Sequence, residues 1–353
     1  MITRWTRYFA VCCACCVLTL PCWLYYLTKE DSRAHPDPED TKIVLLWTPF
    51  FGKVNYLNFS AEYPCRETRC LFTSDRSLLN RSHALVFHSA DITDFPVRPR
   101  PEQVWVWHTL EAPPNTGSLR DFDGLFNWTA TYRLDSDVPA PYGWFRRLRP
   151  DEPAPSLRDY WRGKSAPAVW FVSNCLTYSN REGYVRELRR SLPVDVVGFC
   201  GNLSCSPKMA DACYREASRT YFFYLAFENA HCKDYVTEKF FHALRYDMVP
   251  VVFGGANYSA FLPPGAYVDA SLFPRPDTLA LFLRKVAANR TLYNSYFLWR
   301  RNYTSGGYHW SCELCRKLHS DPPTAASVYS RLEDWWIEGG RCRKWRDGVL
   351  TSP

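Results

Sequence analysis

The chain has 353 residues, of which 46% are hydrophobic, so it can bury one large core or two of ordinary size. Its formal net charge is +7, from 43 Lys and Arg against 36 Asp and Glu. Such a charge could suit nucleic acid, but an anionic nucleotide or an acidic glycan is sufficient to explain it. The membrane topology predicted next argues against a nucleic-acid partner.

The first predicted element is a membrane-spanning helix. Residues 8–27 read YFAVCCACCVLTLPCWLYYL, twenty residues without a formal charge, enough to cross roughly 30 Å of hydrocarbon at about 1.5 Å per residue. Arg4 and Arg7 precede this run and an acidic segment follows it, so the positive-inside rule predicts a cytoplasmic tail, 1–7, and a luminal body. A cleaved signal peptide is the alternative, but no small-x-small cleavage site follows. We expect an uncleaved single-pass type II anchor and a polar stem at 28–41.

Two counts support a luminal body. Ten cysteines follow the anchor, an even number that suits disulfides in an oxidising compartment. The five cysteines inside the anchor are better explained as small apolar fillers or acylation sites. Seven sequons predict N-glycosylation, at Asn58, Asn80, Asn127, Asn202, Asn257, Asn289 and Asn302.

The body alternates between predicted strands and helices. The strands are expected at 42–47, 83–88, 103–108, 168–174, 194–199, 221–227 and 249–254. Helical patterns lie at 180–191 and 235–247, and a Pro- and Arg-rich passage at 138–167 indicates an inter-domain connection. Continuous apolar strands between helices indicate buried parallel sheets. We predict two Rossmann-like, doubly wound α/β domains facing a cleft, at 42–150 and 151–353.

The junction between the strand at 221–227 and the helix at 235–247 is rich in polar residues. Glu228 and Asn229 fall just past the carboxyl end of the strand, where ligands bind in doubly wound sheets, and Asp234 is a candidate N-cap. The residues on the polar face of the helix are Tyr235, Glu238, Lys239 and His242. A helix N-terminus beside a lysine can bind a diphosphate, but a solvated face with a Glu–Lys pair has the same spacing. Spacing alone does not decide between them.

This junction carries a family resemblance. FYLAFENAHCKDYVTEKFFHAL (223–244), with VPVVFGG and FLPPGAYVDA after it, closely resembles the signature of the α1,3/4-fucosyltransferases of glycosyltransferase family 10. Further similar stretches are VWVWHTLEAPPNT (104–116), LFNWTATYRLDSDVPAPYG (125–143), WFVSNCLTYSNREGYVREL (170–188) and CELC (312–315). Members of that family are single-pass Golgi enzymes that move fucose from GDP-fucose to N-acetylglucosamine in glycans. The resemblance implies a GT-B fold with an acceptor-side first domain, a GDP-fucose-binding second domain and a tail that returns to the first.

The resemblance also implies roles for single residues. Glu111 matches the catalytic base, although the family's Glu-Ser-Pro is Glu111-Ala112-Pro113 in this chain, which removes a hydroxyl that could orient the carboxylate. The implied donor-binding residues are Tyr142, Ser173, Asn174, Arg181, Tyr224, Asn229, Tyr235, Glu238 and Lys239. Arg181 and Lys239 would neutralise the departing diphosphate without a metal, while added manganese could still stimulate GDP release.

Two metal-binding alternatives remain open from the residues alone. Asp135-Ser136-Asp137 matches the Asp-x-Asp motif with which another glycosyltransferase architecture holds manganese, whereas its position in this family predicts a structural or acceptor-side role. The CELC motif could be half of a zinc site with His309, His319 and Cys342. The family pattern instead implies the disulfides Cys65–Cys312 and Cys70–Cys315. It leaves open the pairing of Cys175, Cys200, Cys205, Cys213, Cys232 and Cys342.

The function expected from the resemblance is an inverting α1,3-fucosyltransferase in the Golgi membrane. One alternative is a transferase of the same fold that uses another nucleotide sugar. A second, favoured only by Ala112, is an inactive membrane-anchored glycan-binding relative. The acceptor stays open among lactosamine, the chitobiose core of N-glycans and LacdiNAc.

Overall fold

The computed structural model describes residues 40–54, 57, 65–207, 210–261, 263, 265–307, 309–320, 328–346 and 348–351. The chain divides into two units, 1–41 and 42–353, and every strand and helix named below belongs to the second. No helix among the described residues is long and apolar enough to cross a membrane. The predicted tail and anchor, 1–27, and nearly all of the predicted stem lie outside the described residues.

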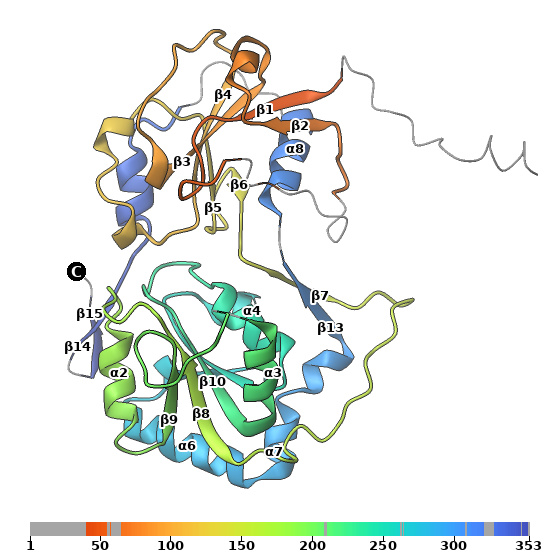
Figure 1. Ribbon diagram of the computed structural model, residues 1–353, viewed down its shortest axis with the longest axis vertical. Helices are drawn as coiled ribbons and strands as arrows, with labels where there is room; N and C mark the ends of the chain where they lie inside the picture. The colour runs from red at the N-terminus through yellow and green to blue at the C-terminus, as the bar shows by residue number, and fades with distance from the viewer. Residues whose placement is uncertain are drawn as a thin grey trace, which may run out of the picture. The chain divides into compact units, whose positions relative to one another are not determined.

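The first sheet has six parallel strands in the order β2-β1-β3-β4-β5-β6 (Figure 1). Its strands are β1 (Lys42–Leu46), β2 (Cys70–Thr73), β3 (Ala84–His88), β4 (Val104–Thr109), β5 (Trp128–Thr131) and β6 (Val138–Pro139). Short 3-10 turns accompany them: η1 (Arg76–Arg81), η2 (Ser89–Asp91), η3 (Pro113–Asn115) and η4 (Arg120–Phe122). Every residue of β3, β4 and β5 is buried, as expected for parallel strands that are covered on both faces.

The second sheet has five parallel strands in the order β12-β11-β10-β8-β9. They are β8 (Ala166–Phe171), β9 (Val194–Val197), β10 (Tyr221–Phe227), β11 (Val249–Phe253) and β12 (Val268–Asp269). The helices of this region are α2 (Arg181–Leu188), α3 (Asp211–Thr220), α4 (Glu238–Arg245), α5 (Tyr258–Phe261), α6 (Pro276–Ala288) and α7 (Arg290–Ser295). Side chains of β10 alternate between two cores: Phe223 and Leu225 pack with α2 and α6, whereas Tyr224 and Ala226 pack with α3 and α4.

Both sheets have the same strand order, because in each the chain's first strand lies between the second and the third. The order therefore reverses between β8 and β10 in the second sheet, and between β1 and β3 in the first. In doubly wound sheets, ligands bind beyond the carboxyl ends of the strands at such a reversal. The parallel α/β architecture agrees with the predicted fold class.

The last part of the chain completes the first sheet's core. Helix α8 (Trp310–Ser320) packs Trp310 and Leu314 against one set of β-strand side chains, and Trp336 packs against the other. The remaining elements are the antiparallel pairs β7 (Trp144–Arg147) with β13 (Tyr303–Gly306) and β14 (Lys344–Arg346) with β15 (Val349–Thr351), and the turns η5 (Ala270–Leu272), η6 (Leu298–Arg301) and η7 (Asp334–Glu338). Strands β6 and β7 both lie in the passage at 138–167 for which only a connection was predicted.

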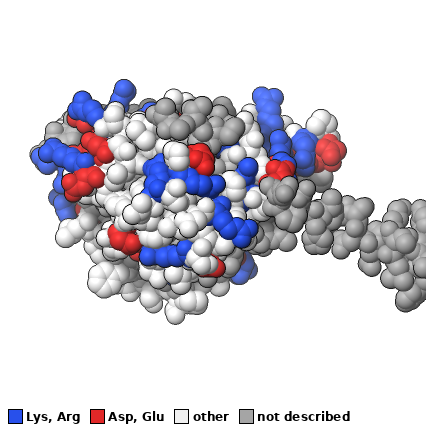
Figure 2. All heavy atoms as spheres, turned by 90° about the horizontal axis from the view of Figure 1, so that it is seen from above, with Lys and Arg blue, Asp and Glu red and all other residues white. Residues whose placement is uncertain are grey.

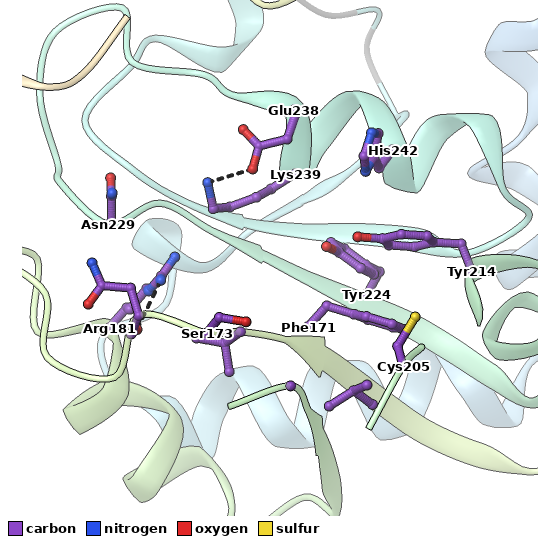
Figure 3. A pocket seen from close by; sticks show the side chains of 14 residues that line it. Phe171, Ser173, Arg181, Cys205, Tyr214, Tyr224, Asn229, Glu238, Lys239 and His242 are labelled. Carbon is purple, nitrogen blue, oxygen red and sulfur yellow. Dashed lines mark hydrogen bonds and ion pairs between the residues drawn. The ribbon is translucent and has the colours of Figure 1, made fainter. Parts of the chain in front are cut away.

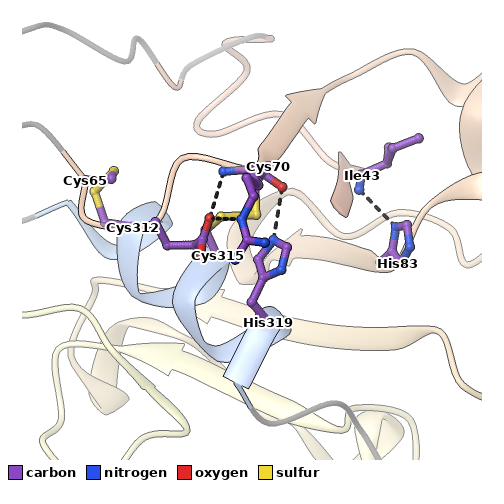
Figure 4. The surroundings of a disulfide bond; sticks show 9 residues. Ile43, Cys65, Cys70, His83, Cys312, Cys315 and His319 are labelled. Atoms are coloured by element: carbon purple, nitrogen blue, oxygen red, sulfur yellow. Dashed lines mark hydrogen bonds and ion pairs between the residues drawn. A yellow bond between two sulfur atoms is a disulfide. The ribbon is translucent and has the colours of Figure 1, made fainter. Parts of the chain in front are cut away.

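Five disulfides pair all ten cysteines that follow the predicted anchor. Cys65–Cys312 fastens α8 to the segment before β2, and Cys70–Cys315 fastens it to the first residue of β2, with the same partners that the family resemblance implies (Figure 4). The other three are Cys175–Cys200, Cys205–Cys213 and Cys232–Cys342. The CELC sulfurs are thus bonded to other cysteines rather than free as zinc ligands. His319 Nε2 lies 3.1 Å from the carbonyl oxygen of Arg69.

The sequon asparagines differ in their exposure to solvent. Asn127 is only 6% exposed, and its side-chain oxygen accepts hydrogen bonds from Trp105 N and Arg98 Nη1, so the folded chain does not present this amide for glycosylation. Asn58 lies outside the described residues. The exposed sequon residues are Asn80, Asn202, Asn257, Asn289 and Asn302. On the face in Figure 2, basic side chains lie in small groups with acidic ones beside them rather than in one continuous basic surface.

Arg133 connects the first sheet to the C-terminal segment. It is 2% exposed, donates to both carboxylate oxygens of Asp135 at 2.8 and 2.6 Å, and donates to the carbonyl oxygen of Trp335. Burial raises the pKa of Asp135, but hydrogen bonds from Arg133 and Lys233 outweigh burial and lower it to about 2. Both oxygens of Asp135 are therefore occupied by cations of the protein itself.

We expect Arg133→Met to lower the free energy of unfolding by about 2–4 kcal/mol, because it removes a buried charged donor and leaves the Asp135 carboxylate and the Trp335 carbonyl oxygen without its hydrogen bonds. The matched control is Arg120→Met. Arg120 also reaches the C-terminal segment, through Glu333 at 3.0 Å, but its side chain is 83% exposed, so its loss should cost less than about 1 kcal/mol. Urea unfolding of both variants measures the difference, and equal losses would contradict the buried role of Arg133.

Candidate functional site

A pocket opens at the carboxyl ends of β8 and β10, where the strand order of the second sheet reverses (Figure 3). Its walls are Phe171, Val172, Ser173, Asn174, Arg181, Val197, Gly198, Cys205, Tyr214, Tyr224, Asn229, Glu238, Lys239 and His242. In Figure 3 the charged side chains and Asn229 lie toward one end, and the aromatic rings lie toward the other. The pocket thus offers a polar part and an aromatic part to one ligand.

The ends of two strands position three residues of the polar part. Ser173 and Asn174 follow β8, and Asn229 follows β10, so neighbouring parallel strands deliver them to the same edge of the sheet. The side-chain oxygen of Asn229 is buried, and it has no hydrogen-bond partner within the described part of the chain. An unpaired buried acceptor is costly, so this oxygen is suited to accept a hydrogen bond from a ligand hydroxyl or amine.

Glu228 determines where α4 begins. Its carboxylate is 1% exposed and accepts hydrogen bonds from the Thr237 backbone N–H and hydroxyl, both at 2.8 Å. Thr237 therefore becomes the N-cap, and the predicted helix start at 235 with Asp234 as N-cap is wrong. Asp234 has a φ of 59°, in the left-handed region, which turns the chain before the helix.

Lys239 lies in the first turn of α4 and faces the polar part of the pocket. Its Nζ is 3.4 Å from Glu228 Oε2 and 3.1 Å from Glu238 Oε1, and it donates to the Thr237 hydroxyl at 2.8 Å. Burial lowers the pKa of Lys239, but Glu228 and Glu238 outweigh burial, so the pKa is raised overall. The ammonium is therefore held charged in a mostly buried position.

Arg181 is a cation of the pocket that has no counterion among the described residues. It is 3% exposed and donates to the carbonyl oxygens of Phe227 at 2.6 Å and Asn174 at 3.3 Å, while its Nε has no partner in the described structure. None of the ion pairs between described residues includes Arg181. Burial lowers its pKa, against the attraction of Glu228 and Glu182. A buried guanidinium without an ion pair favours an anionic ligand.

Two of the four rings in the aromatic part, Phe171 and Tyr214, were not singled out from the sequence. Phe171 and Tyr214 stack with ring centroids 4.6 Å apart, and Tyr224 lies 5.9 Å from Phe171. His242 contacts Tyr214 edge-on at 5.2 Å, and its buried Nδ1 lacks a partner among the described residues. Planar rings beside an unpaired ring nitrogen suit a nucleobase, which stacks and presents polar edges. Phe171 lies inside a predicted strand, 168–174, and is the last residue of β8. Tyr214 lies on α3, for which no helix was predicted.

The pocket gathers seven of the residues proposed for donor binding: Ser173, Asn174, Arg181, Tyr224, Asn229, Glu238 and Lys239. Tyr142 and Tyr235 do not line it. Tyr235 precedes α4, is 2% exposed and packs on Tyr132 with ring centroids 4.7 Å apart, so its predicted place on the helix face is wrong. Tyr142 donates its hydroxyl to the carbonyl oxygen of Leu110 at 2.7 Å.

Glu111 also lies outside the pocket. It lies two residues after the end of β4. Burial raises the pKa of Tyr142, and the negative charges of Glu238 and Glu111 raise it further. Burial likewise raises the pKa of Tyr235, with further contributions from Glu228 and Glu111. The charge of Glu111 therefore acts on both tyrosines, together with Glu238 on Tyr142 and Glu228 on Tyr235. Glu111 and the carboxylates beside the pocket thus influence the same two side chains.

The Asp-Ser-Asp motif is engaged in internal contacts. Asp137 Oδ2 accepts from Thr129 N at 2.9 Å and from the Tyr329 hydroxyl at 2.8 Å. Asp135 pairs with Arg133 and, at 2.9 Å, with Lys233. These bonds agree with the structural reading of the motif.

The chain is similar to proteins of one family along most of its length. Two family models match, described as "Fucosyltransferase, N-terminal" over residues 39–143 and "Glycosyltransferase family 10 (fucosyltransferase) C-term" over 161–335. Alpha-(1,3)-fucosyltransferase C of Drosophila melanogaster is 38% identical over 339 residues, covering 86% of this chain and 79% of that protein. Alpha-(1,3)-fucosyltransferase 7 of Rattus norvegicus is 35% identical over 328 residues, covering 89% of this chain and 85% of that protein.

A solved structure titled "Crystal Structure of alpha1,3-Fucosyltransferase with GDP-fucose" superposes with a TM-score of 0.53. The superposition covers 85% of this chain and 95% of that chain, at 15% sequence identity. At that identity the likeness concerns the fold.

We expect Arg181→Met and Lys239→Met each to weaken GDP binding about 10- to 100-fold, the loss of a hydrogen bond to a charged group. The matched control is Arg186→Met, because Arg186 lies on the same helix as Arg181 but is exposed. It should stay within about twofold of the unaltered protein. Titration calorimetry with GDP measures all three. Unchanged GDP affinity in both pocket variants would instead support the alternative in which the polar face of α4 carries only a solvated Glu–Lys pair.

Proposed function

The chain belongs to glycosyltransferase family 10, the fucosyltransferases, and on that premise we propose that it is an inverting α1,3-fucosyltransferase. The donor would be GDP-fucose, and the acceptor the 3-hydroxyl of N-acetylglucosamine in a glycan. The relatives described above are alpha-(1,3)-fucosyltransferases, and the solved structure with a similar fold is that of an alpha1,3-fucosyltransferase with GDP-fucose.

The observation that carries the proposal is the buried guanidinium of Arg181, which has no ion pair with any described residue, beside the ammonium of Lys239. A nucleoside diphosphate sugar has the matching chemistry. Its base can stack at Phe171 and Tyr214, its diphosphate can neutralise the two cations, and its hydroxyls can reach the free oxygen of Asn229.

In the proposed reaction the acceptor oxygen attacks the anomeric carbon of fucose from the face opposite the diphosphate. The bond between that carbon and the diphosphate oxygen breaks, GDP departs, and the acceptor's proton passes to the carboxylate of Glu111. Negative charge builds on the leaving diphosphate, where Arg181 and Lys239 stabilise it more strongly than in the ground state. Asn229 and Glu238 would orient the sugar hydroxyls.

We also propose that the body is luminal and anchored in the Golgi membrane by residues 8–27. The pairing of all ten body cysteines supports an oxidising compartment. The five exposed sequons are consistent with passage through the secretory pathway.

The substitution at Ala112 is the one feature that favours an inactive glycan-binding relative. Ala112 is fully buried, and its carbonyl oxygen accepts from Asn115 N at 2.8 Å, so the turn that carries Glu111 is formed without a serine. The carboxylate and both cations are retained, which supports the active enzyme.

The test is incubation of the full-length protein, purified in detergent, with GDP-fucose and glycans ending in lactosamine, chitobiose core or LacdiNAc. Transfer to the 3-hydroxyl of N-acetylglucosamine is expected for at least one of them. Glycan binding without turnover would favour the inactive relative. Turnover only with GDP-mannose or UDP-N-acetylglucosamine would favour a transferase with another donor.

We expect Glu111→Gln to keep GDP binding and to lower kcat by about 10²- to 10⁴-fold, because the amide is nearly isosteric but cannot accept the proton. Asp121→Asn is the control, since Asp121 is an exposed carboxylate in the nearby turn η4. Near-normal turnover of the Glu111 variant would remove this residue from the mechanism.

We expect activity to survive exhaustive EDTA treatment with at least about half of its rate, because side-chain cations stand where a metal would neutralise the diphosphate. Some stimulation by added manganese is compatible with this mechanism. Complete loss with EDTA that only manganese restores, matched by the loss in Asp137→Asn, would assign the diphosphate to the Asp-Ser-Asp motif instead.

A further inference from the structure

The side chain of Glu111 has one hydrogen-bond partner within the described part of the chain. Asn115, four residues further on, donates from Nδ2 to Glu111 Oε2 at 3.0 Å. We propose that Asn115 is a positioning residue, which holds one carboxylate oxygen so that the other faces the acceptor hydroxyl. This inference rests on the proposed function, because it assumes that Glu111 is the base.

The backbone on both sides of this pair is already fixed. Before it, the Tyr142 hydroxyl donates to Leu110 O at 2.7 Å. After it, the indole N–H of the fully buried Trp336 donates to the Thr116 hydroxyl at 2.9 Å. The main chain that carries Glu111 is thus held from two directions, and the freedom that remains belongs mainly to its side chain.

The turn itself brings the two side chains together. Asn115 N donates to Ala112 O at 2.8 Å, which closes the short helix η3 and places Asn115 beside Glu111. Ala112 is fully buried and its methyl side chain carries no hydrogen-bond donor, so that side chain cannot orient the carboxylate. The amide of Asn115 supplies that donor from the solvent side of the turn.

The pair suits a base that works by position. A carboxylate with one oxygen bonded and one free loses less rotational freedom when the acceptor arrives than a carboxylate that rotates freely. Because the hydrogen bond is exposed to water, its contribution should be moderate.

The test compares Asn115→Ala and Asn115→Asp with the unaltered full-length protein. Asn115→Ala should lower kcat about 5- to 30-fold and leave GDP affinity and the KM for GDP-fucose within about twofold. Asn115→Asp should lose at least as much, because it replaces the donor with a second negative charge at the same distance. Asn115→His should recover most of the rate, since its Nδ1–H stands as far from the backbone as the lost amide N–H.

A double variant distinguishes positioning from a general disturbance. If Asn115 acts through Glu111, then Asn115→Ala should lower the residual rate of Glu111→Gln by less than about twofold. A full 5- to 30-fold loss in that background, equal losses of GDP affinity, or no rescue by histidine would overturn the proposal. If Glu111→Gln itself retains normal turnover, the proposed base fails first, and the result is recognisable before Asn115 is altered.

Discussion

The buried carboxylate of Glu228 sets the geometry on which the pocket depends. It accepts two hydrogen bonds from Thr237 at 2.8 Å, and these bonds fix the first turn of α4 against the end of β10. An unpaired carboxylate would be costly in this place, so Lys239 at 3.4 Å acts as its counterion. The same ammonium faces the pocket. Lys239 thus stabilises the helix junction and also contributes positive charge to the site.

Arg181 differs from Lys239 because its hydrogen-bond acceptors are uncharged. Its guanidinium is held by carbonyl oxygens of Phe227 and Asn174, which set its direction without neutralising its charge. The folded protein therefore carries the desolvation cost of a cation that the ligand would offset. Lys239 already pairs with two carboxylates. Arg181 is therefore the cation that a bound anion would neutralise most.

The sequence predicted the strands better than the site. Apolar runs such as 221–227 coincide with β10 because a buried parallel strand needs every side chain to be apolar. The edge strands β6 and β12 have two residues each, too few to show a pattern. The start of α4 depends on a tertiary bond from Glu228, so local periodicity placed it three residues early.

The same limit explains the site residues. Arg181, Asn229 and Lys239 were predicted through the family resemblance and meet in the pocket. Tyr235 was placed on the helix face by helical spacing that does not exist before Glu238, whereas its donor-binding role was implied by the family resemblance. Tyr214 comes from α3, and its place beside Phe171 arises only when α3 packs on the sheet, so no local pattern could indicate it.

The C-terminal segment, residues 329–346, joins loops that belong to different sheets. Trp336 bonds the turn after Glu111 through Thr116, and Gly340 O accepts from Lys233 N at 2.8 Å in the loop before α4. Cys232–Cys342 makes the second link covalent.

A third contact of this segment reaches the entry to α2, where Trp345 N donates to Ser179 O at 3.1 Å, two residues before Arg181. The loops that carry the proposed base and both cations are therefore tied to one stretch of chain. A displacement reaction requires the base, the acceptor and the leaving group to be aligned together, and errors of about 1 Å are costly. Tying the three loops to a common segment makes their relative position a property of the fold rather than of each loop alone.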